Sequence, residues 1–103
     1  MLDLLKKMMG IGPSVDIAQL IQDGAVILDV RTKSEYAGGH VKGSVNIPLD
    51  QLNKHFDKLK KQNKVIVTCC ASGMRSASAA GMLKSHGIEA HNGGSWLSVR
   101  NKI

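Results

Sequence analysis

The sequence predicts an α/β domain in which helices cover both faces of a central, mainly parallel sheet. Two mostly apolar runs, at residues 25–30 and 65–69, lack the polar alternation of a half-exposed strand. Such runs are typical of parallel strands buried on both faces. Segments with helical spacing of apolar residues lie between and after them, so that strands and helices alternate. With 103 residues, of which 43% are hydrophobic, the chain has the size and composition of one domain with one core.

An N-terminal extension is expected over residues 1–13, followed by a single domain over residues 14–103. Leu2, Leu5 and Met9 recur at helical spacing within the extension, which is a short amphipathic segment. A helix packed on the domain is favoured over a helix on a membrane surface, because the segment is short and contains only two lysines.

Caps and glycines predict the boundaries of the other elements. Ser14 is expected to cap a first helix whose Val15 faces the core. Asp50 is expected to cap a helix over residues 51–61, and Ser95 the last helix. The remaining elements are a helical turn begun by Thr32 or Ser34, a strand at 44–48, a helix at 75–86, a strand at 88–91 and a turn at Gly93 and Gly94.

The basic composition points to an anionic ligand or partner without identifying it. The formal net charge is +6, but Tyr, Trp and Phe occur only once each. Nucleic acid is not expected as a partner, because the lysines are spread out and no aromatic residues alternate with them. A run of lysines is interpreted as a solvated helix face, the alternative being a docking surface for an acidic partner protein. These lysines are Lys54, Lys58, Lys60, Lys61 and Lys64.

The two cysteines, Cys69 and Cys70, are neighbours and cannot join distant parts of a fold. This excludes the disulfide scaffold of a small secreted protein and favours free thiols in a reducing compartment. The sequence predicts neither a signal peptide nor a membrane-spanning helix. We therefore expect a cytoplasmic protein without a membrane partner.

Cys70 lies where a predicted strand ends and a short loop leads into a helix. In open parallel sheets, ligands bind beyond the carboxyl ends of the strands. The small loop residues allow backbone N–H groups to turn inward, the helix adds its positive N-terminal end, and Arg75 adds a full positive charge. These groups favour a thiolate nucleophile at Cys70 and could hold a persulfide or an oxyanion. The binding residues expected beside Cys70 are Ala71, Ser72, Gly73, Met74 and Arg75.

Other reactive side chains are given structural roles. Cys69 points away from Cys70 along the strand, and we interpret it as a core thiol rather than a resolving cysteine. Asp29 and Arg31 are interpreted as an ion pair rather than as a general base with its partner. Glu35 is interpreted as a helix-face carboxylate. No metal site is expected, because the histidines lack paired ligand spacing; His40 is expected to anchor a loop.

Three segments together resemble the rhodanese family, specifically its small single-domain sulfurtransferases. They are "ILDVRTKSEYAGGHVKGSVNIPL", "VIVTCCASGMRSASAAGMLKSHGI" and "NGGSW", within about residues 14–100. The resemblance implies a rhodanese-like three-layer fold and a Cys70 that carries a sulfane sulfur as a persulfide. The donor would be a small anion of the thiosulfate or polysulfide type, and the acceptor cyanide or a thiol. Neither a metal nor an organic cofactor is implied.

The resemblance also indicates which of the possible functions is preferred. The loop from Cys70 to Arg75 has six residues, whereas related phosphatases on this fold use a loop one residue longer. Ala71 stands where thiosulfate-preferring relatives often have a basic residue, so the loop has one cation rather than two. Sulfur transfer is therefore preferred over a phosphatase or arsenate reductase. A non-catalytic module that relays sulfur or binds a partner is the other alternative.

Overall fold

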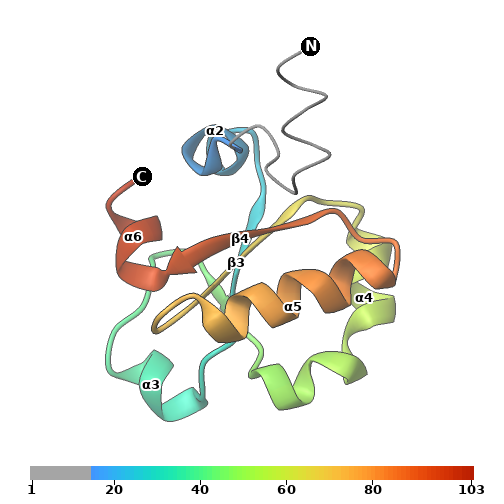
Figure 1. Ribbon diagram of the computed structural model, residues 1–103, viewed down its shortest axis with the longest axis horizontal. Coiled ribbons are helices and arrows are strands. Elements are labelled where there is room, and N and C mark those ends of the chain that lie inside the picture. Colours follow the sequence, from blue (N-terminus) through green and yellow to red (C-terminus); the bar gives the residue numbers. More distant parts are fainter. Residues whose placement is uncertain (1–14) are drawn as a thin grey trace, which may run out of the picture.

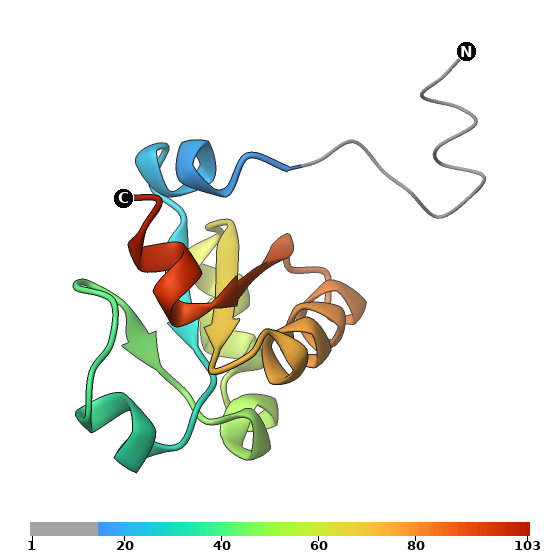
Figure 2. The ribbon, with the colours of Figure 1, turned by 60° about the vertical axis from the view of Figure 1, so that its left-hand side comes forward.

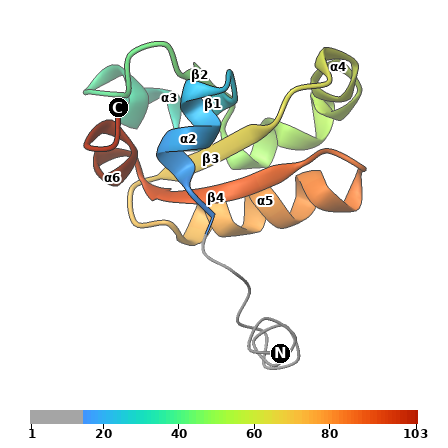
Figure 3. The same cartoon turned by 90° about the horizontal axis from the view of Figure 1, so that it is seen from above.

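The computed structural model describes residues 15–103, which form a four-stranded parallel sheet flanked by helices (Figure 1). The sheet order is β2-β1-β3-β4, as Figure 3 shows from above. The predicted α/β class with a mainly parallel sheet is confirmed. The strands are β1 (Val26–Asp29), β2 (Val45–Asn46), β3 (Ile66–Cys70) and β4 (Ala90–Ser95).

Strand β3 lies in the middle of the sheet, between β1 and β4. All five of its residues are buried, as expected of a parallel strand covered on both faces. Its last residue is Cys70, so the strand delivers the candidate nucleophile to the carboxyl-terminal edge of the sheet.

Helices cover both faces of the sheet and complete three layers (Figure 2). One face packs against a 3₁₀ helix, α4 and α5, and its buried cluster includes Leu28, Leu83 and Cys70. The other face packs against α2 and α6, and its cluster includes Cys69 and Val99. Successive strand residues point to opposite faces, which explains why the adjacent cysteines belong to different clusters. The helices are α2 (Ile17–Gln22), α3 (Lys33–Ala37), η1 (Leu49–Lys54), α4 (Phe56–Gln62), α5 (Met74–Ser85) and α6 (Trp96–Arg100).

The beginning of the first described helix differs from the prediction. Asp16 caps α2 by accepting a hydrogen bond from the backbone N–H of Gln19. Val15 is 47% exposed, so its predicted place in the core is wrong. It precedes the cap and therefore does not share the inward face of the helix. The predicted cap Ser14 and the extension over residues 1–13 lie outside the described residues.

The single helix predicted over residues 51–61 is divided in two. Asp50 lies inside η1, whose N-cap is Pro48, and so it does not begin a helix. The backbone leaves helical geometry at His55, with φ −117° and ψ 1°, before α4 begins. The five lysines of this region are all exposed, on η1, on α4 and just after α4, as either a solvated face or a docking surface requires.

Strand β4 continues through Gly93 and Gly94, where a turn was predicted. A Cβ at Gly93 would lie 2.8 Å from side-chain atoms of both Val67 and Val99, so the strand packs closer than any side chain allows. Gly94 has φ +89°, and the pairing of β3 with β4 shifts register between Thr68 and Cys70. The glycines therefore serve close packing and a strand irregularity rather than a turn.

Across residues 15–103, we find no helix with both the length and the apolar character needed to span a bilayer.

Candidate active site

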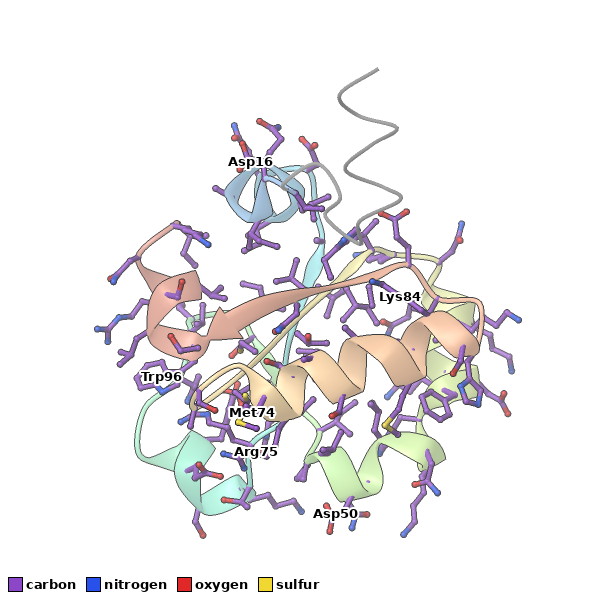
Figure 4. The ribbon with its side chains drawn as sticks, in the orientation of Figure 1. Asp16, Asp50, Met74, Arg75, Lys84 and Trp96 are labelled. Carbon is purple, nitrogen blue, oxygen red and sulfur yellow. The ribbon has the colours of Figure 1, made fainter. Side chains whose placement is uncertain are left out.

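The loop after Cys70 is short and is fixed by a glycine. Gly73 caps α5 with φ +101°, a backbone conformation that other residues rarely adopt. A Cβ at this position would also lie 3.3 Å from the Cα of Gly94 on β4. Both constraints bring the first turn of α5 close to the end of β3. Figure 4 shows Met74 and Arg75 at this first turn.

Three hydrogen-bonding groups surround the sulfur of Cys70. The backbone N–H groups of Gly73 and Ser76 donate to Sγ at 3.0 and 3.4 Å, and Ser76 Oγ lies 3.3 Å from it. The Cys70 residue itself has no exposed surface. Of the predicted binding residues, Gly73 contacts the sulfur through its N–H. Ser72 Oγ instead accepts from the N–H of Met74 at 3.5 Å.

This environment lowers the pKa of the Cys70 thiol below its ordinary value. Burial acts in the opposite direction, because it disfavours the charged form. The hydroxyl of Ser76 and the backbone N–H groups of Ser76 and Gly73 outweigh burial by hydrogen bonding to the thiolate. The lowered pKa favours the thiolate, which is the nucleophilic form of Cys70.

Ser76 and Asn92 complete the site, and neither was predicted from the sequence. Ser76 Oγ lies 2.7 Å from Asn92 Oδ1, which also accepts the N–H of Gly94 at 3.0 Å. Asn92 Nδ2 donates to the carbonyl oxygen of Gly73 at 3.1 Å, which ties β4 to the loop. The hydroxyl has one proton, so it donates either to Sγ or to Asn92, and the thiolate needs that proton. The one feature of the sequence that could have indicated a role for Ser76 is its position directly after Arg75.

Replacing Ser76 with alanine is expected to raise the pKa of Cys70 and to slow alkylation of its thiolate at pH 7 about tenfold. The reason is the loss of a hydrogen bond to a charged group, which contributes about 1.5–3 kcal/mol. Thiolate absorbance against pH, corrected with a Cys70→Ala protein, gives the titration. Ser78→Ala is the matched control, because Ser78 is exposed on the same helix. An unchanged titration midpoint in Ser76→Ala would contradict this role of the hydroxyl.

Arg75 is not a free cation at the rim, because Glu35 pairs with it. Its Nη1 and Nη2 atoms donate to the two carboxylate oxygens of Glu35 at 2.8 and 2.9 Å. This bidentate pair lowers the pKa of Glu35 to about 2, with help from the N–H of Thr32. Glu35 is a carboxylate on helix α3, as predicted, and the structure adds its pairing with Arg75. The partners are 40 residues apart in the chain, so no local pattern could reveal the pair.

Asp29 and Arg31 form the predicted structural ion pair below the loop. The side chains are almost fully buried, and Arg31 Nη2 lies 2.8 Å from Asp29 Oδ2. Arg31 also donates to the carbonyl oxygens of Glu35 and Gly39, at 3.3 and 2.7 Å. The pair therefore holds α3, and with it Glu35, against the end of β1.

Cys69 lies in an apolar environment on the opposite face of the sheet from Cys70. Burial, with the nearby carboxylate of Asp29, raises the pKa of Cys69 to about 12. A thiol with this pKa stays protonated at neutral pH, as expected for the predicted core thiol.

His40 has the predicted anchoring geometry. Its Nδ1 lies 2.8 Å from the carbonyl oxygen of Tyr36, and the two rings stack at 3.8 Å. No group of three or more potential metal ligands occurs among residues 15–103.

Both the sequence and the fold of this chain are similar to those of known proteins. The family model described as "Rhodanese-like domain" matches residues 14–97. A rhodanese-like domain protein from Staphylococcus aureus superposes with a TM-score of 0.66 at 32% identity, over 74% of each chain. The tRNA sulfurtransferase of Thermoplasma acidophilum is 36% identical over 72 residues, which are 69% of this chain and 14% of that protein.

A relative with a different name matches to a similar extent. The tRNA uridine(34) hydroxylase of Salmonella newport is 32% identical over 81 residues, which are 73% of this chain and 23% of that enzyme. The chain thus spans less than a quarter of the length of either of these curated relatives. From the matching family model and the three-layer fold around the Cys70 loop, we conclude that the chain belongs to the rhodanese-like family.

Proposed function

We propose that the protein is a sulfurtransferase that carries a sulfane sulfur as a persulfide on Cys70. The observation that supports this most directly is the set of hydrogen bonds at Sγ. Two backbone N–H groups and a hydroxyl are directed at one sulfur atom, in an arrangement that stabilises a negative charge there. The relative named as a sulfurtransferase is consistent with this chemistry.

The reaction would proceed in two displacements. The Cys70 thiolate attacks the outer sulfur of the donor, and the donor's S–S bond breaks. Its electron pair leaves with sulfite from thiosulfate, with a sulfinate from a thiosulfonate, with the shortened polysulfide from a polysulfide, or with a thiolate from an organic persulfide. A thiophilic acceptor such as cyanide then attacks the outer sulfur of the persulfide, and the electron pair returns to Sγ. Charge and atoms balance in both steps, and neither step needs a metal or an organic cofactor.

In this cycle the donor must reach a sulfur atom that is buried. Cys70 has no exposed surface, whereas Met74 of the same loop is 78% exposed. A donor can therefore reach Sγ only when loop residues move aside. The persulfide anion would then take over hydrogen bonds that the thiolate receives from the loop.

Intact mass spectrometry tests the proposal. Reduced protein is exposed to thiosulfate and, in parallel, to polysulfide, and cyanide is then added. A gain of one sulfur atom that cyanide removes as thiocyanate is the expected result. No gain with either donor, together with hydrolysis of an aryl phosphate, would favour the phosphatase or arsenate reductase alternative.

A sulfur-relay module is the second candidate, and the buried position of Cys70 favours it. Such a module would load sulfur but would release it only to a specific protein, for example an acidic partner docked on the exposed lysines. Rapid turnover with cyanide as acceptor would argue against a relay. Loading without release to small acceptors would support it.

A further inference from the structure

The active-site loop has one basic side chain, and its charge is balanced. Among residues 70–75 only Arg75 is basic, and its guanidinium group forms a two-pronged ion pair with Glu35. Side-chain exposures of 38% and 35% make this pair a weak contributor to stability. Its main effect is on the electric field near the loop, because the carboxylate cancels much of the charge that would attract an anionic donor.

Glu35 is held in this position by its own helix. Its Oε1 accepts hydrogen bonds from the N–H and the hydroxyl of Thr32, at 3.0 and 3.1 Å, in a capping box at the start of α3. The same oxygen accepts Arg75 Nη1 at 2.8 Å. The carboxylate is therefore fixed between the cap and the loop, and it does not swing freely away from Arg75 (Figure 4 shows Arg75 on the side of α5 that faces α3).

A cavity of about 360 Å³ adjoins Arg75, and its lining is mainly apolar. Val30, Pro48 and Leu49 supply apolar surface, and Asp50 supplies a second carboxylate. Val30 belongs to the same buried cluster as Cys70, and Leu49 packs against that cluster. The adjoining cavity is lined by Lys33, but Asp50 lies in that lining as well. An organic group would thus find apolar contacts here, whereas the one cation that lines this cavity, Arg75, is paired with Glu35.

We propose that Glu35 determines donor specificity, and that the site prefers a sulfane donor with an organic substituent and at most one negative charge over the thiosulfate dianion. An organic persulfide or a thiosulfonate belongs to this class. The inference depends on the proposed sulfurtransferase function and specifies its substrate. The organic group would occupy the apolar cavity, and Glu35 would repel the second charge of thiosulfate.

Thiosulfate and benzenethiosulfonate form a well-matched pair of probes. In both, the Cys70 thiolate attacks the terminal sulfur, a bond forms between it and Sγ, and the donor's S–S bond breaks. The electron pair leaves with sulfite in one case and with benzenesulfinate in the other. The same bonds form and break, but the donors differ in charge, in the aromatic ring and in leaving group. The leaving-group difference is the same in every variant, so the change in the ratio between variants reports the effect of charge.

The test compares kcat/KM for the two donors in the full chain, with thiocyanate formation from cyanide as the readout. Wild type is expected to favour benzenethiosulfonate. Glu35→Gln is expected to raise kcat/KM for thiosulfate relative to benzenethiosulfonate about tenfold, because it removes one unit of negative charge beside the loop cation. Glutamine retains a cap acceptor, so the change alters charge more than structure. Asp57→Asn, an exposed carboxylate on α4, is the charge-matched control and is expected to leave the ratio unchanged.

A second variant distinguishes an electrostatic role from a structural one. Arg75→Gln leaves the negative charge of Glu35 unopposed and is expected to lower kcat/KM for thiosulfate relative to benzenethiosulfonate. The double variant, which combines Glu35→Gln with Arg75→Gln, is expected to return this ratio toward the wild-type value. A structural role would instead lower both efficiencies together. If all variants load sulfur and have the same ratio of kcat/KM for the two donors, the inference about Glu35 is wrong, whereas the proposed sulfurtransferase function still stands. Failure of thiosulfate, benzenethiosulfonate and polysulfide alike to load wild-type Cys70 would overturn the proposed function itself.

Discussion

Replacing Cys70 with alanine is expected to abolish sulfur loading, with a loss of transfer rate on the order of a thousandfold or more. In the proposed reaction the transferred sulfur is bonded to Sγ of Cys70, and no other thiol can replace it. Cys69 lies on the other face of the sheet, and its pKa of about 12 keeps it protonated. The measurement is intact mass after exposure to the donor, together with thiocyanate formation from cyanide.

Cys69→Ala is the matched control for this experiment. It removes the other thiol from a buried position and is expected to cost about 1 kcal/mol of stability, in the range for a small core deletion. Loading should persist in this variant. Sulfur uptake that continues in Cys70→Ala and disappears in Cys69→Ala would reverse the assignment of the two cysteines.

Replacing Gly93 with alanine is expected to lower the free energy of unfolding by about 3 kcal/mol, the upper part of the range for overpacking. The new Cβ would lie 2.8 Å from Val67 Cγ1 and Val99 Cγ2, and 2.9 Å from the backbone oxygen of Thr68. None of these atoms is the end of a flexible side chain, so β4 must move away from β3. Chemical denaturation followed by circular dichroism measures the effect.

Gly81→Ala provides the control, because it adds the same methyl group without a clash. Gly81 lies in the interior of α5, and a Cβ there would meet no heavy atom within 4 Å. The change is expected to stabilise the protein by about 0.5–1 kcal/mol through helix propensity. Equal effects of the two substitutions would show that the close packing at Gly93 is relieved at little cost.

The Gly93 variant also connects the fold to the site. Its neighbours Asn92 and Gly94 place a side-chain oxygen and a carbonyl oxygen near the hydroxyl of Ser76. A shift of β4 would therefore change the hydrogen bonding of Ser76, and with it the stabilisation of the Cys70 thiolate. We expect the same variant to lose loading rate as well as stability.

Sequence reasoning was most successful where the determinants are local. Apolar runs predicted the buried strands, and the opposite directions of Cys69 and Cys70 follow from strand geometry alone. Thr32 and Ser95 cap their helices as predicted, because a capping side chain needs only the backbone three residues ahead. The errors at Asp50 and at Gly93 and Gly94 occurred where local preference competes with packing against another element.

The α/β class, the place of Cys70 at the end of a strand and the short loop that follows it could be predicted from the amino-acid order. Each of these depends on residues that are close in the chain. Only folding brings together the groups that meet at that loop: Glu35 with Arg75, 40 residues apart, and Ser76 with Asn92, 16 residues apart. Such contacts depend on how the sheet orders its strands and on how closely β4 approaches β3. The charge and hydrogen bonding of the site therefore became visible only once the chain was folded.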